Sequence, residues 1–387
     1  MRALLVALGD LGRSPRIQLH ARALAGAGAT VDLVGFAGTR CWLLDGCASV
    51  RLHPIDGGPA LNGSGFGTAW RGAALASRLT RALLNLPRPD VVLVQTPPAI
   101  PTVAVAALIA RARGAGLVVD WHNLGYTLLA LRMGERHPLV RVAERLEGLA
   151  RAAGARHLCV SAALQQHLAR RYGIAATVFA DRPASAFRPG DDRELRRSFT
   201  FGLGVPGDPL LVVSPTSWTV DEDLALLDRA AGLLEGQLRE RDVLFVATGQ
   251  GPGRERFDTE WRKRKAGRVH LRTAWLEGPD YPRLLAAADL GLSLHRSSSG
   301  LDLPMKIADM LGAGLPVCAL EYPALGEQLV AGRDGWLFRD EGELASLVAR
   351  MACDGRLLEE ARRAVAQAPR ETWEEGWARE ARDVILG

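Results

Sequence analysis

The chain has 387 residues, which is enough for two or three domains that each bury a core of their own. Hydrophobic residues make up 48% of the chain and charged residues 24%, an ordinary mixture for a globular protein that excludes disordered and fibrous classes. The charge is split unevenly, because residues 1–185 carry 21 arginines and 10 acids while residues 186–387 carry 27 basic and 33 acidic residues. A basic first half favours an anionic ligand, such as a phosphorylated substrate, an anionic lipid surface or a nucleic acid.

Secretory and membrane-spanning segments are not expected. The longest apolar run, Ala99 to Ala110, has twelve residues and contains Pro101, whereas a bilayer span needs about 20. The start of the chain, MRALLVALGD, is too short for a secretory signal and is typical of a first β-strand. The five cysteines form no CxxC pair, so we expect reduced thiols and neither a disulfide framework nor a thiolate zinc site. These features predict a cytoplasmic protein.

Strand-like runs alternate with helical patterns along the whole chain, which predicts an α/β fold with parallel sheets and crossover helices. Several runs are continuously apolar, as strands covered on both faces are. The expected strands are residues 3–8, 30–36, 90–95, 117–121 and 157–161 in the first half, and residues 209–214, 242–248, 268–273, 290–294 and 316–320 in the second.

Two Rossmann-like, doubly wound domains are therefore predicted. We assign residues 1–186 to the first and residues 209–370 to the second, with residues 187–208, rich in Gly, Pro and charge, as the linker. Residues 371–387 are expected to form a final helix, whose tryptophans have the spacing of a packing face. This helix is a candidate for packing against the first domain instead of the second. Ligands of such domains bind at the carboxyl ends of the strands, so the chemistry is expected in the loops that follow them.

The loop after the first strand leads directly into a helix. Ser14 suits the N-cap, Pro15 the first helical position and Gly28 the end of the helix. A helix N-terminus carries unpaired N–H groups and partial positive charge, to which Arg13 and Arg16 add two cations. We interpret this loop as a site for an anion or an acceptor; the alternative is a tight turn with solvated arginines.

The strand at residues 117–121 places Asp120, His122 and Asn123 at the mouth of the first domain. A histidine in that position can take up or release a proton near neutral pH. His122 is therefore a candidate for proton transfer, with a structural histidine as the alternative.

The richest loop is LHRSSSGLDLPMK, residues 294–306, between an expected strand and an expected helix. Its backbone N–H groups can hold a diphosphate, Lys306 can neutralise that charge, and Asp309 on the helix can bind ribose hydroxyls. We interpret this stretch as a nucleotide-sugar site. The run TGQGPGRERF, residues 248–257, also follows a strand and opens a helix, and by itself it is a weak signal for nucleotide approach.

Other patterns do not indicate a site. A GxGxxG formed by Gly202, Gly204 and Gly207 precedes a strand instead of following one, and the chain has no GxxxxGK[ST]. Residues 221–223, Asp-Glu-Asp, have the form of a metal clamp, but acids in the first turn of a helix are also favoured by its dipole. We therefore expect no metal to be required.

Several of these stretches together resemble the cytosolic β-mannosyltransferase family that adds the first mannose to chitobiosyl-diphosphodolichol from GDP-mannose. The resemblance implies a GT-B fold with the acceptor bound mainly by the first domain and the donor by the second. It also implies an inverting, metal-independent transfer that forms a β-1,4-mannoside. The matching pieces, in chain order, are GDLGRSPRIQLHARALA, QTPPAIP, VVDWHNLGYTLL, DRPASAF, SPTSWTVDEDLALL, TGQGP, WLEGPDYPRLLAAADLGLSLHRSSSGLDLPMKIADMLGAGLPVCAL and DGWLF, and SSSGLDLPMK is the most specific of them.

With this mechanism as the expectation, we assign roles to individual residues by their positions. The base that deprotonates the acceptor is assigned to His122, with Asp10 and Asp120 in reserve. The donor contacts assigned are Gly251, Arg254, His295, Ser298, Ser299, Gly300, Lys306 and Asp309. The acceptor or phosphate contacts assigned are Gly12, Arg13, Ser14, Arg16 and Asn123.

The chain departs from the related enzymes in three places. Their paired-acid motif ends where Asp309 stands, but its first acid falls at Leu301, with Asp302 one place off. Many carry Arg and Lys after the first strand of the donor domain, where this chain reads SPTSWT. Eukaryotic members have an N-terminal membrane anchor, whereas here the sequence starts on the first strand. An amphipathic stretch at residues 70–86 is a candidate for peripheral membrane attachment, with a helix packed on its own domain as the alternative.

Two alternatives to this function remain. One is a GT-B glycosyltransferase with another nucleotide sugar or a soluble acceptor, and the other is a non-catalytic binding module with the same fold. Nucleic acid is not an expected partner, because the basic residues lack interleaved aromatic residues.

Overall fold

The computed structural model describes residues 1–56, 65–201, 207–265 and 267–387. The chain forms two compact units, of which unit 1 comprises Met1–Asp181 and Trp373–Gly387 and unit 2 comprises Arg182–Thr372. Part of the expected linker, Arg193–Thr200, is a helix of unit 2. Gly202 and Gly204 of the GxGxxG pattern lie outside the described residues.

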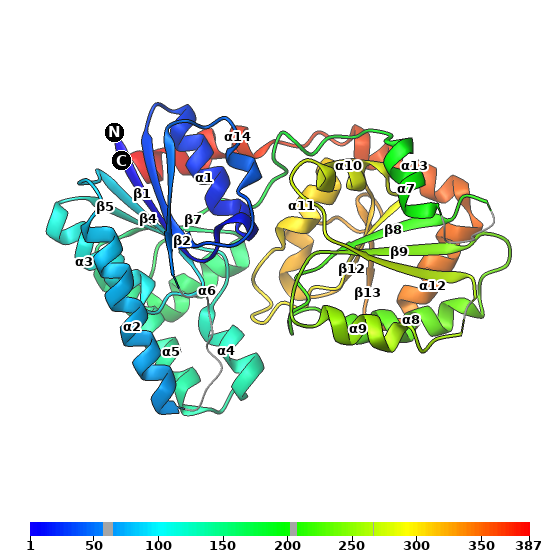
Figure 1. Cartoon of the computed structure of the whole chain (residues 1–387), viewed down its shortest axis with the longest axis horizontal. Helices are drawn as coiled ribbons and strands as arrows, with labels where there is room; N and C mark the ends of the chain where they lie inside the picture. Colours follow the sequence, from blue (N-terminus) through cyan, green and yellow to red (C-terminus); the bar gives the residue numbers. More distant parts are fainter. Residues whose placement is uncertain (57–64, 202–206, 266) are drawn as a thin grey trace. The chain divides into compact units, whose positions relative to one another are not determined.

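Unit 1 is built on a parallel sheet with the order β3-β2-β1-β4-β5-β6-β7 in its described residues. The central strands are buried almost throughout because α1 and the C-terminal helices cover one face and α2 and α3 the other (Figure 1). The strands are β1 (Arg2–Asp10), β2 (Thr30–Phe36), β3 (Val50–Ile55), β4 (Val91–Thr96), β5 (Gly116–Trp121), β6 (Arg156–Cys159) and β7 (Thr177–Val178). The helices are α1 (Pro15–Gly26), α2 (Gly65–Leu84), α3 (Thr102–Arg113), α4 (Gly125–Met133), α5 (Pro138–Gly148), α6 (Ala162–Tyr172), α14 (Trp373–Gly376) and α15 (Arg382–Leu386), with the short turns η1 (Leu11–Arg13), η2 (Trp42–Leu44), η3 (Leu149–Ala153) and η5 (Trp377–Ala381).

Unit 2 has a second parallel sheet, ordered β10-β9-β8-β11-β12-β13 within the described part of the chain. The strands are β8 (Leu210–Pro215), β9 (Val243–Thr248), β10 (Val269–Ala274), β11 (Leu290–Ser293), β12 (Val317–Leu320) and β13 (Gly335–Phe338). The helices are α7 (Arg193–Thr200), α8 (Leu224–Glu235), α9 (Arg254–Trp261), α10 (Asp280–Ala287), α11 (Met305–Gly312), α12 (Glu341–Cys353) and α13 (Gly355–Gln367), with the turn η4 (Pro323–Glu327).

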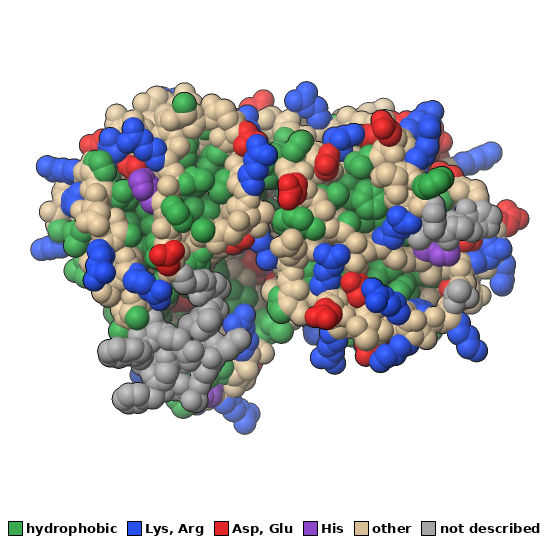
Figure 2. Space-filling view, viewed as in Figure 1, with side chains coloured by type: hydrophobic (Ala, Val, Ile, Leu, Met, Phe, Trp, Pro, Cys, Tyr) green, Lys and Arg blue, Asp and Glu red, His purple; other side chains and the backbone are tan. Residues whose placement is uncertain are grey.

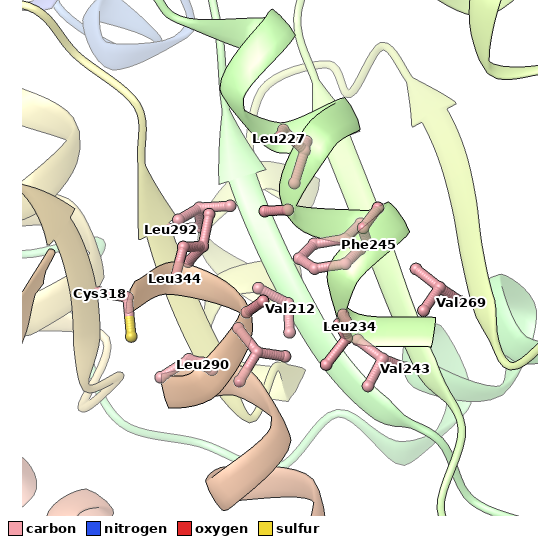
Figure 3. Close-up of a cluster of buried hydrophobic side chains, with 14 of the residues drawn as sticks. Val212, Leu227, Leu234, Val243, Phe245, Val269, Leu290, Leu292, Cys318 and Leu344 are labelled. Atoms are coloured by element: carbon pink, nitrogen blue, oxygen red, sulfur yellow. The ribbon is translucent and has the colours of Figure 1, made fainter. Parts of the chain in front are cut away.

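The core of unit 2 shows why its strands read as apolar runs. Leu227 and Leu234 of α8 and Leu344 of α12 pack on strand residues such as Val212 and Phe245 (Figure 3). Each of these five side chains is at most 1% exposed. Burial of a Leu or Phe side chain contributes roughly 1.5–3 kcal/mol, so this layer holds α8 and α12 on the sheet.

The ten expected strands are all present, and the structure adds the edge strands β3, β7 and β13. The expected N-terminal cap is confirmed in position, since α1 begins at Pro15 after Ser14, and Gly28 follows it with φ of +85°. The five cysteines are free thiols.

The amphipathic stretch proposed for membrane attachment lies largely in α2. Its Leu79 and Leu83 are buried at 0% and 1% exposure, so this apolar face packs within unit 1. The arginines of its C-terminal half, Arg78 and Arg81, are exposed. The described part of α2 therefore agrees with the alternative to membrane attachment, a helix packed on its own domain. On the face in Figure 2, Lys and Arg side chains are dispersed among acidic and apolar ones and form no single stripe.

Candidate active site

The pair formed by His122 and Asp181 lies at the carboxyl ends of the unit 1 strands. His122 directly follows β5, and its Nε2 lies 3.1 Å from Oδ2 of Asp181, three residues after β7. The His122 side chain is 27% exposed, whereas that of Asp181 is fully buried. Burial alone would raise the pKa of Asp181, but Arg16 and His122 lower it below its usual value. An ionised carboxylate only accepts, so Nε2 of His122 carries the proton and Nδ1 holds the lone pair of the neutral ring.

Arg16 does not have the position that we expected for an acceptor or phosphate contact. Its guanidinium is 1% exposed, makes a bidentate pair with Asp120 at 2.7 Å and reaches Asp181 at 2.5 Å. The rings of Phe179 and Trp373 stack on it at 4.9 Å and 5.3 Å. Because its charge is neutralised inside the fold, Arg16 holds Asp181 in place and does not meet a ligand.

Asp120, a reserve candidate for the base, lies in the same buried network. Its side chain is fully buried, and besides Arg16 it pairs with Nε2 of His20 at 3.2 Å. Burial would raise the pKa of Asp120, but the Arg16 charge lowers it far below its usual range. Trp377 of the C-terminal segment donates to Nδ1 of His20 at 3.2 Å, so Asp120 is enclosed and cannot reach an acceptor hydroxyl.

Asp10, the other reserve base, organises the loop that precedes α1. Its carboxylate accepts from the backbone N–H groups of Gly12 and Thr39, each at 3.0 Å, and from the Thr39 hydroxyl at 2.8 Å. Gly12 fits because a Cβ there would lie 2.2 Å from the Thr39 carbonyl oxygen. Ser14 donates from its hydroxyl to the Asp10 carbonyl at 2.9 Å, and Arg13 is exposed. Of these residues, Arg13 is the one whose side chain extends into solvent.

The start of α4 follows His122 and is fixed by two polar side chains. Asn123 is 6% exposed and accepts from the N–H of Leu124 at 2.7 Å. Glu147 of α5 is 2% exposed and accepts from the N–H of Tyr126 at 3.2 Å. Burial raises the pKa of Glu147 to about 8, against the opposing effect of the backbone N–H groups of Gly125 and Tyr126. Near neutral pH this carboxyl is therefore mostly protonated.

In unit 2, Lys306 at the start of α11 forms an ion pair with Glu222. The Glu222 side chain is 2% exposed and that of Lys306 is 18% exposed. Glu222 also accepts from the Thr216 hydroxyl and from the N–H groups of Ser217 and Trp218, at 2.8 Å and 3.2 Å. Burial would raise the pKa of Glu222, but Lys306 lowers it, so the carboxylate is ionised. Lys306 is thus tied to the loop after β8.

The serine-rich loop after β11 is folded around Asp302. This carboxylate, 3% exposed, pairs with Nε2 of His295 at 2.8 Å and accepts from the Ser297 hydroxyl. Gly300, at φ of +72°, donates its N–H to Ser297 at 2.7 Å, and the next N–H donates to Ser299 at 3.1 Å. These bonds fix the loop at the carboxyl end of β11, and Ser298 and Ser299 keep partial exposure.

The glycine-rich loop after β9 packs on the loop after β8. A Cβ on Gly251 would lie 1.9 Å from the Ser217 carbonyl oxygen, so this close approach requires glycine. Arg254 contacts the Thr273 hydroxyl at 3.2 Å and lies 3.8 Å from Asp258. The loop is therefore held by backbone contact, and Arg254 is held by residues of β10 and α9.

Asp309 lies one turn after Lys306 on the same side of α11. It is 8% exposed. Burial and, second, the Asp309 carboxylate raise the pKa of Tyr281 on α10 well above its usual value. Lys306 and Asp309 are thus three residues apart on α11, where Lys306 pairs with Glu222 and Asp309 lies near Tyr281.

The acids at residues 221–223 have separate partners. Glu222 pairs with Lys306, and Asp223 caps α8 by accepting from the N–H of Leu226 at 2.9 Å. Asp221 lies 3.7 Å from Nδ1 of His295. Across residues 1–56, 65–201, 207–265 and 267–387, no group of three or more His, Cys, Asp or Glu side chains is arranged to hold a metal ion.

Sequence reasoning missed the roles of Asp181, Glu222 and Asp302, which hold His122, Lys306 and His295. Asp181 stands in DRPASAF, a stretch that supports the family resemblance without indicating its partner. Glu222 belongs to the acidic run at residues 221–223, which is typical of the start of a helix. Its partner Lys306 lies 84 residues further along the chain. No local signal in the sequence indicates that contact.

Two family models match the chain: Glycosyltransferase Family 4 over residues 16–179 and Glycosyl transferase-like over residues 230–382. A chitobiosyldiphosphodolichol beta-mannosyltransferase from Yarrowia lipolytica is 36% identical, and the match covers 98% of this chain and 85% of that protein. The chain belongs to the chitobiosyldiphosphodolichol beta-mannosyltransferase family. As a member of that family it is an enzyme, a glycosyltransferase.

One relative of this beta-mannosyltransferase family member carries a name that specifies a UDP-glycosyltransferase, and solved structures share the fold. The UDP-glycosyltransferase TURAN from Arabidopsis thaliana is 34% identical over 89% of this chain and 87% of its own length. Among solved structures, the lipopolysaccharide glycosyltransferase WaaG matches with a TM-score of 0.70 and 16% identity over all of both chains. This likeness supports the expected GT-B fold of two Rossmann-like units. Among the helices that the structure describes, none combines the length and apolar character that crossing a bilayer requires.

Proposed function

We propose that the chain transfers mannose from GDP-mannose to the terminal sugar of a lipid-linked chitobiosyl diphosphate and forms a β-1,4-mannoside with inversion. The observation that carries this proposal is the 36% identity, over 98% of the chain, to a relative whose name gives a chitobiosyl-diphosphodolichol acceptor and a β-mannosyl transfer. The arrangement of His122 in unit 1 and of Lys306 in unit 2 is consistent with it.

On the acceptor side, His122 is the proposed base. Its Nε2 is held by Asp181, so Nδ1 is the nitrogen that takes the proton from the acceptor hydroxyl. The hydroxyl oxygen then bonds to the anomeric carbon on the face opposite the leaving group, which inverts the configuration. Asp181 stabilises the imidazolium that forms, in the role that a buried carboxylate has beside a general base.

On the donor side, the bond from the anomeric carbon to the diphosphate breaks and its electron pair leaves with GDP. Lys306 is the proposed cation for this growing charge, and the Ser298–Gly300 segment lies in the loop just before its helix. Asp309 is the proposed partner of the ribose hydroxyls. We propose that these protein groups stabilise the leaving diphosphate and that no metal is required.

A UDP-sugar is the second candidate donor, because the relative TURAN is named a UDP-glycosyltransferase. The remaining alternative, a non-catalytic binding module, predicts that donors bind without turnover. Both alternatives differ from the proposal in a measurable product.

The decisive experiment incubates the purified full-length chain with chitobiosyl diphosphate on a short lipid and with GDP-mannose, UDP-glucose or UDP-GlcNAc. We expect transfer from GDP-mannose alone, unaffected by EDTA, and a product that β-mannosidase cleaves. Transfer from a UDP-sugar would establish the second candidate. Donor binding without a product would reject the enzyme mechanism in favour of the binding module, and loss of activity in EDTA would contradict the metal-independent step.

A further inference from the structure

Two helices of unit 1 expose apolar stripes. On α3, Ala104 and Leu108 stand at positions i and i+4, and Leu108 is 68% exposed. On α5 and the adjoining η3, Val142, Leu146 and Leu149 stand at i, i+4 and i+7 and are 47%, 41% and 61% exposed. Residues at these spacings lie on one side of a helix. Each helix therefore turns an apolar ridge away from the core.

The two ridges border one groove of about 650 Å³. Ala104 and Leu108 line one side of it, Leu146 and Leu149 line the other, and Ile100 lies at the end near the carboxyl terminus of β4. Among the described residues that line the groove, Arg111 is the charged one, and the others are apolar or glycine. We call these apolar residues, together with Val142, the α3–α5 surface. A groove lined almost entirely by apolar residues and bordered by exposed leucines is a candidate interaction site.

Exposed arginines accompany the α3–α5 surface. Arg141 and Arg145 stand next to Val142 and Leu146 on α5, and Arg111 is at the end of the α3 ridge. The two acids of α5 do not neutralise them: Glu144 pairs with Arg171 at 2.6 Å, and Glu147 is buried against the start of α4. The surface is therefore apolar along its centre and cationic beside it.

We propose that the α3–α5 surface docks on an anionic phospholipid leaflet. The leucines enter the boundary between headgroups and acyl chains, and the arginine heads reach the lipid phosphates while their stems lie along the apolar surface. This inference rests on the proposed function, since docking brings unit 1 to the membrane that holds a lipid-linked acceptor. It assigns attachment to α3 and α5 in place of the expected stretch in α2.

Charge argues against a second copy of the chain as the occupant. A two-fold contact through this surface would bring the same patch of both copies together, with Arg141 and Arg145 of each facing like charges. An anionic leaflet instead supplies opposite charge to every arginine of the patch.

The experiment is co-sedimentation of the purified full-length chain with vesicles of phosphatidylcholine, with or without phosphatidylglycerol. We expect binding to the anionic vesicles that weakens with salt, and about a tenfold or greater loss of affinity in the double variant Leu108→Gln, Leu149→Gln. The matched control is Leu233→Gln, since Leu233 of α8 in unit 2 is 49% exposed and outside the surface. Arg141→Gln with Arg145→Gln should lose affinity for anionic vesicles, whereas Arg239→Gln should not.

Wild-type affinity in the double leucine variant, or equal binding to vesicles without phosphatidylglycerol, would overturn the proposal. Sedimentation velocity gives a further test. If the wild-type chain is a dimer and the leucine variant a monomer, the proposal is also overturned, because the surface is then an interface between copies. A soluble short-chain acceptor separates this proposal from the proposed function. Docking variants should keep the wild-type transfer rate on it, whereas a wild-type chain that binds vesicles but transfers no mannose would contradict the proposed function alone.

Discussion

His122 donates from Nε2 to Oδ2 of Asp181 across 3.1 Å, and the carboxylate is fully buried while the imidazole keeps 27% exposure. The exposed member of the pair can meet a substrate, and the buried member fixes its tautomer and orientation. We therefore assign Asp181 as a positioning residue whose effect passes through His122.

Asp181→Asn should reduce kcat about tenfold to a hundredfold, because the amide no longer stabilises the imidazolium. The donor KM should stay unchanged, since the proposed donor contacts belong to unit 2. The acid limb of the pH–rate profile should move to lower pH, because a negative charge next to His122 is lost. Steady-state kinetics across pH check this, with Asp45→Asn as the control, since Asp45 pairs with Arg40 on the surface. Full activity in Asp181→Asn would show that Asp181 does not act through His122.

Arg16→Met should lower the free energy of unfolding by about 3–5 kcal/mol, because it leaves Asp120 and Asp181 buried without their cation. Arg13→Met, three residues away and exposed, should change it by no more than about 0.5 kcal/mol. Urea unfolding followed by tryptophan fluorescence measures both. Equal stability of the two variants would show that the network does not hold the fold.

Lys306→Ala should lower the turnover of the nucleotide sugar at least tenfold, because the leaving diphosphate loses the cation that meets its growing charge. Glu222→Gln should lower turnover by a smaller factor, since Lys306 loses the carboxylate that holds it to the loop after β8. The double variant should be no worse than Lys306→Ala, because the two residues act as a unit. Lys263→Ala, which breaks an exposed pair with Glu260, is the control. Additive effects in the double-mutant cycle would show that Glu222 acts independently of Lys306.

Glu147 should make the fold less stable as pH rises. Burial raises its folded-state pKa from 4.5 to about 8, so between these values the unfolded chain releases a proton that the folded chain keeps. Stability from this group is present below about pH 4.5, falls as pH rises to about 8, and is level above that.

Glu147→Gln removes this titration and keeps an oxygen for the N–H of Tyr126. The variant should therefore gain stability relative to the wild type at pH 8.5, on the order of 3 kcal/mol, and little near pH 5. Thermal unfolding at both pH values measures the difference, with exposed Glu135→Gln as control. A constant difference between pH 5 and 8.5 would show that the carboxyl is not protonated in the fold.

The central strands were predictable because both faces of each are covered, which requires continuous apolar sequence. The missed strands lie away from the centre of their sheets. In β3 the residues Arg51, Leu52 and Pro54 are exposed, so no apolar run marks it, and β7 has two residues. β13 is an edge strand that begins with Gly335 and is only partly buried at Trp336 and Leu337, so its sequence is not a run of fully buried apolar residues.

At the site, positions after strands were predictable but partners were not. His122 and Lys306 stand where strand and helix patterns put them, and both are partly exposed. Arg16 and Asp120 look equally suited to a ligand in sequence, yet they meet each other across 104 residues and are buried. Nothing local to either residue encodes that contact, since it depends on how α1 packs beside β5.

The return of Trp373–Gly387 to unit 1 has a consequence for synthesis on the ribosome. Trp373 stacks on Arg16 and Trp377 donates to His20, so the first unit lacks part of its interior until the final residues emerge. Unit 2, continuous from Arg182 to Thr372, is complete earlier. Unit 1 is therefore translated first but completed last, and a nascent chain stalled before Trp373 should leave the region around Arg16 accessible to proteases.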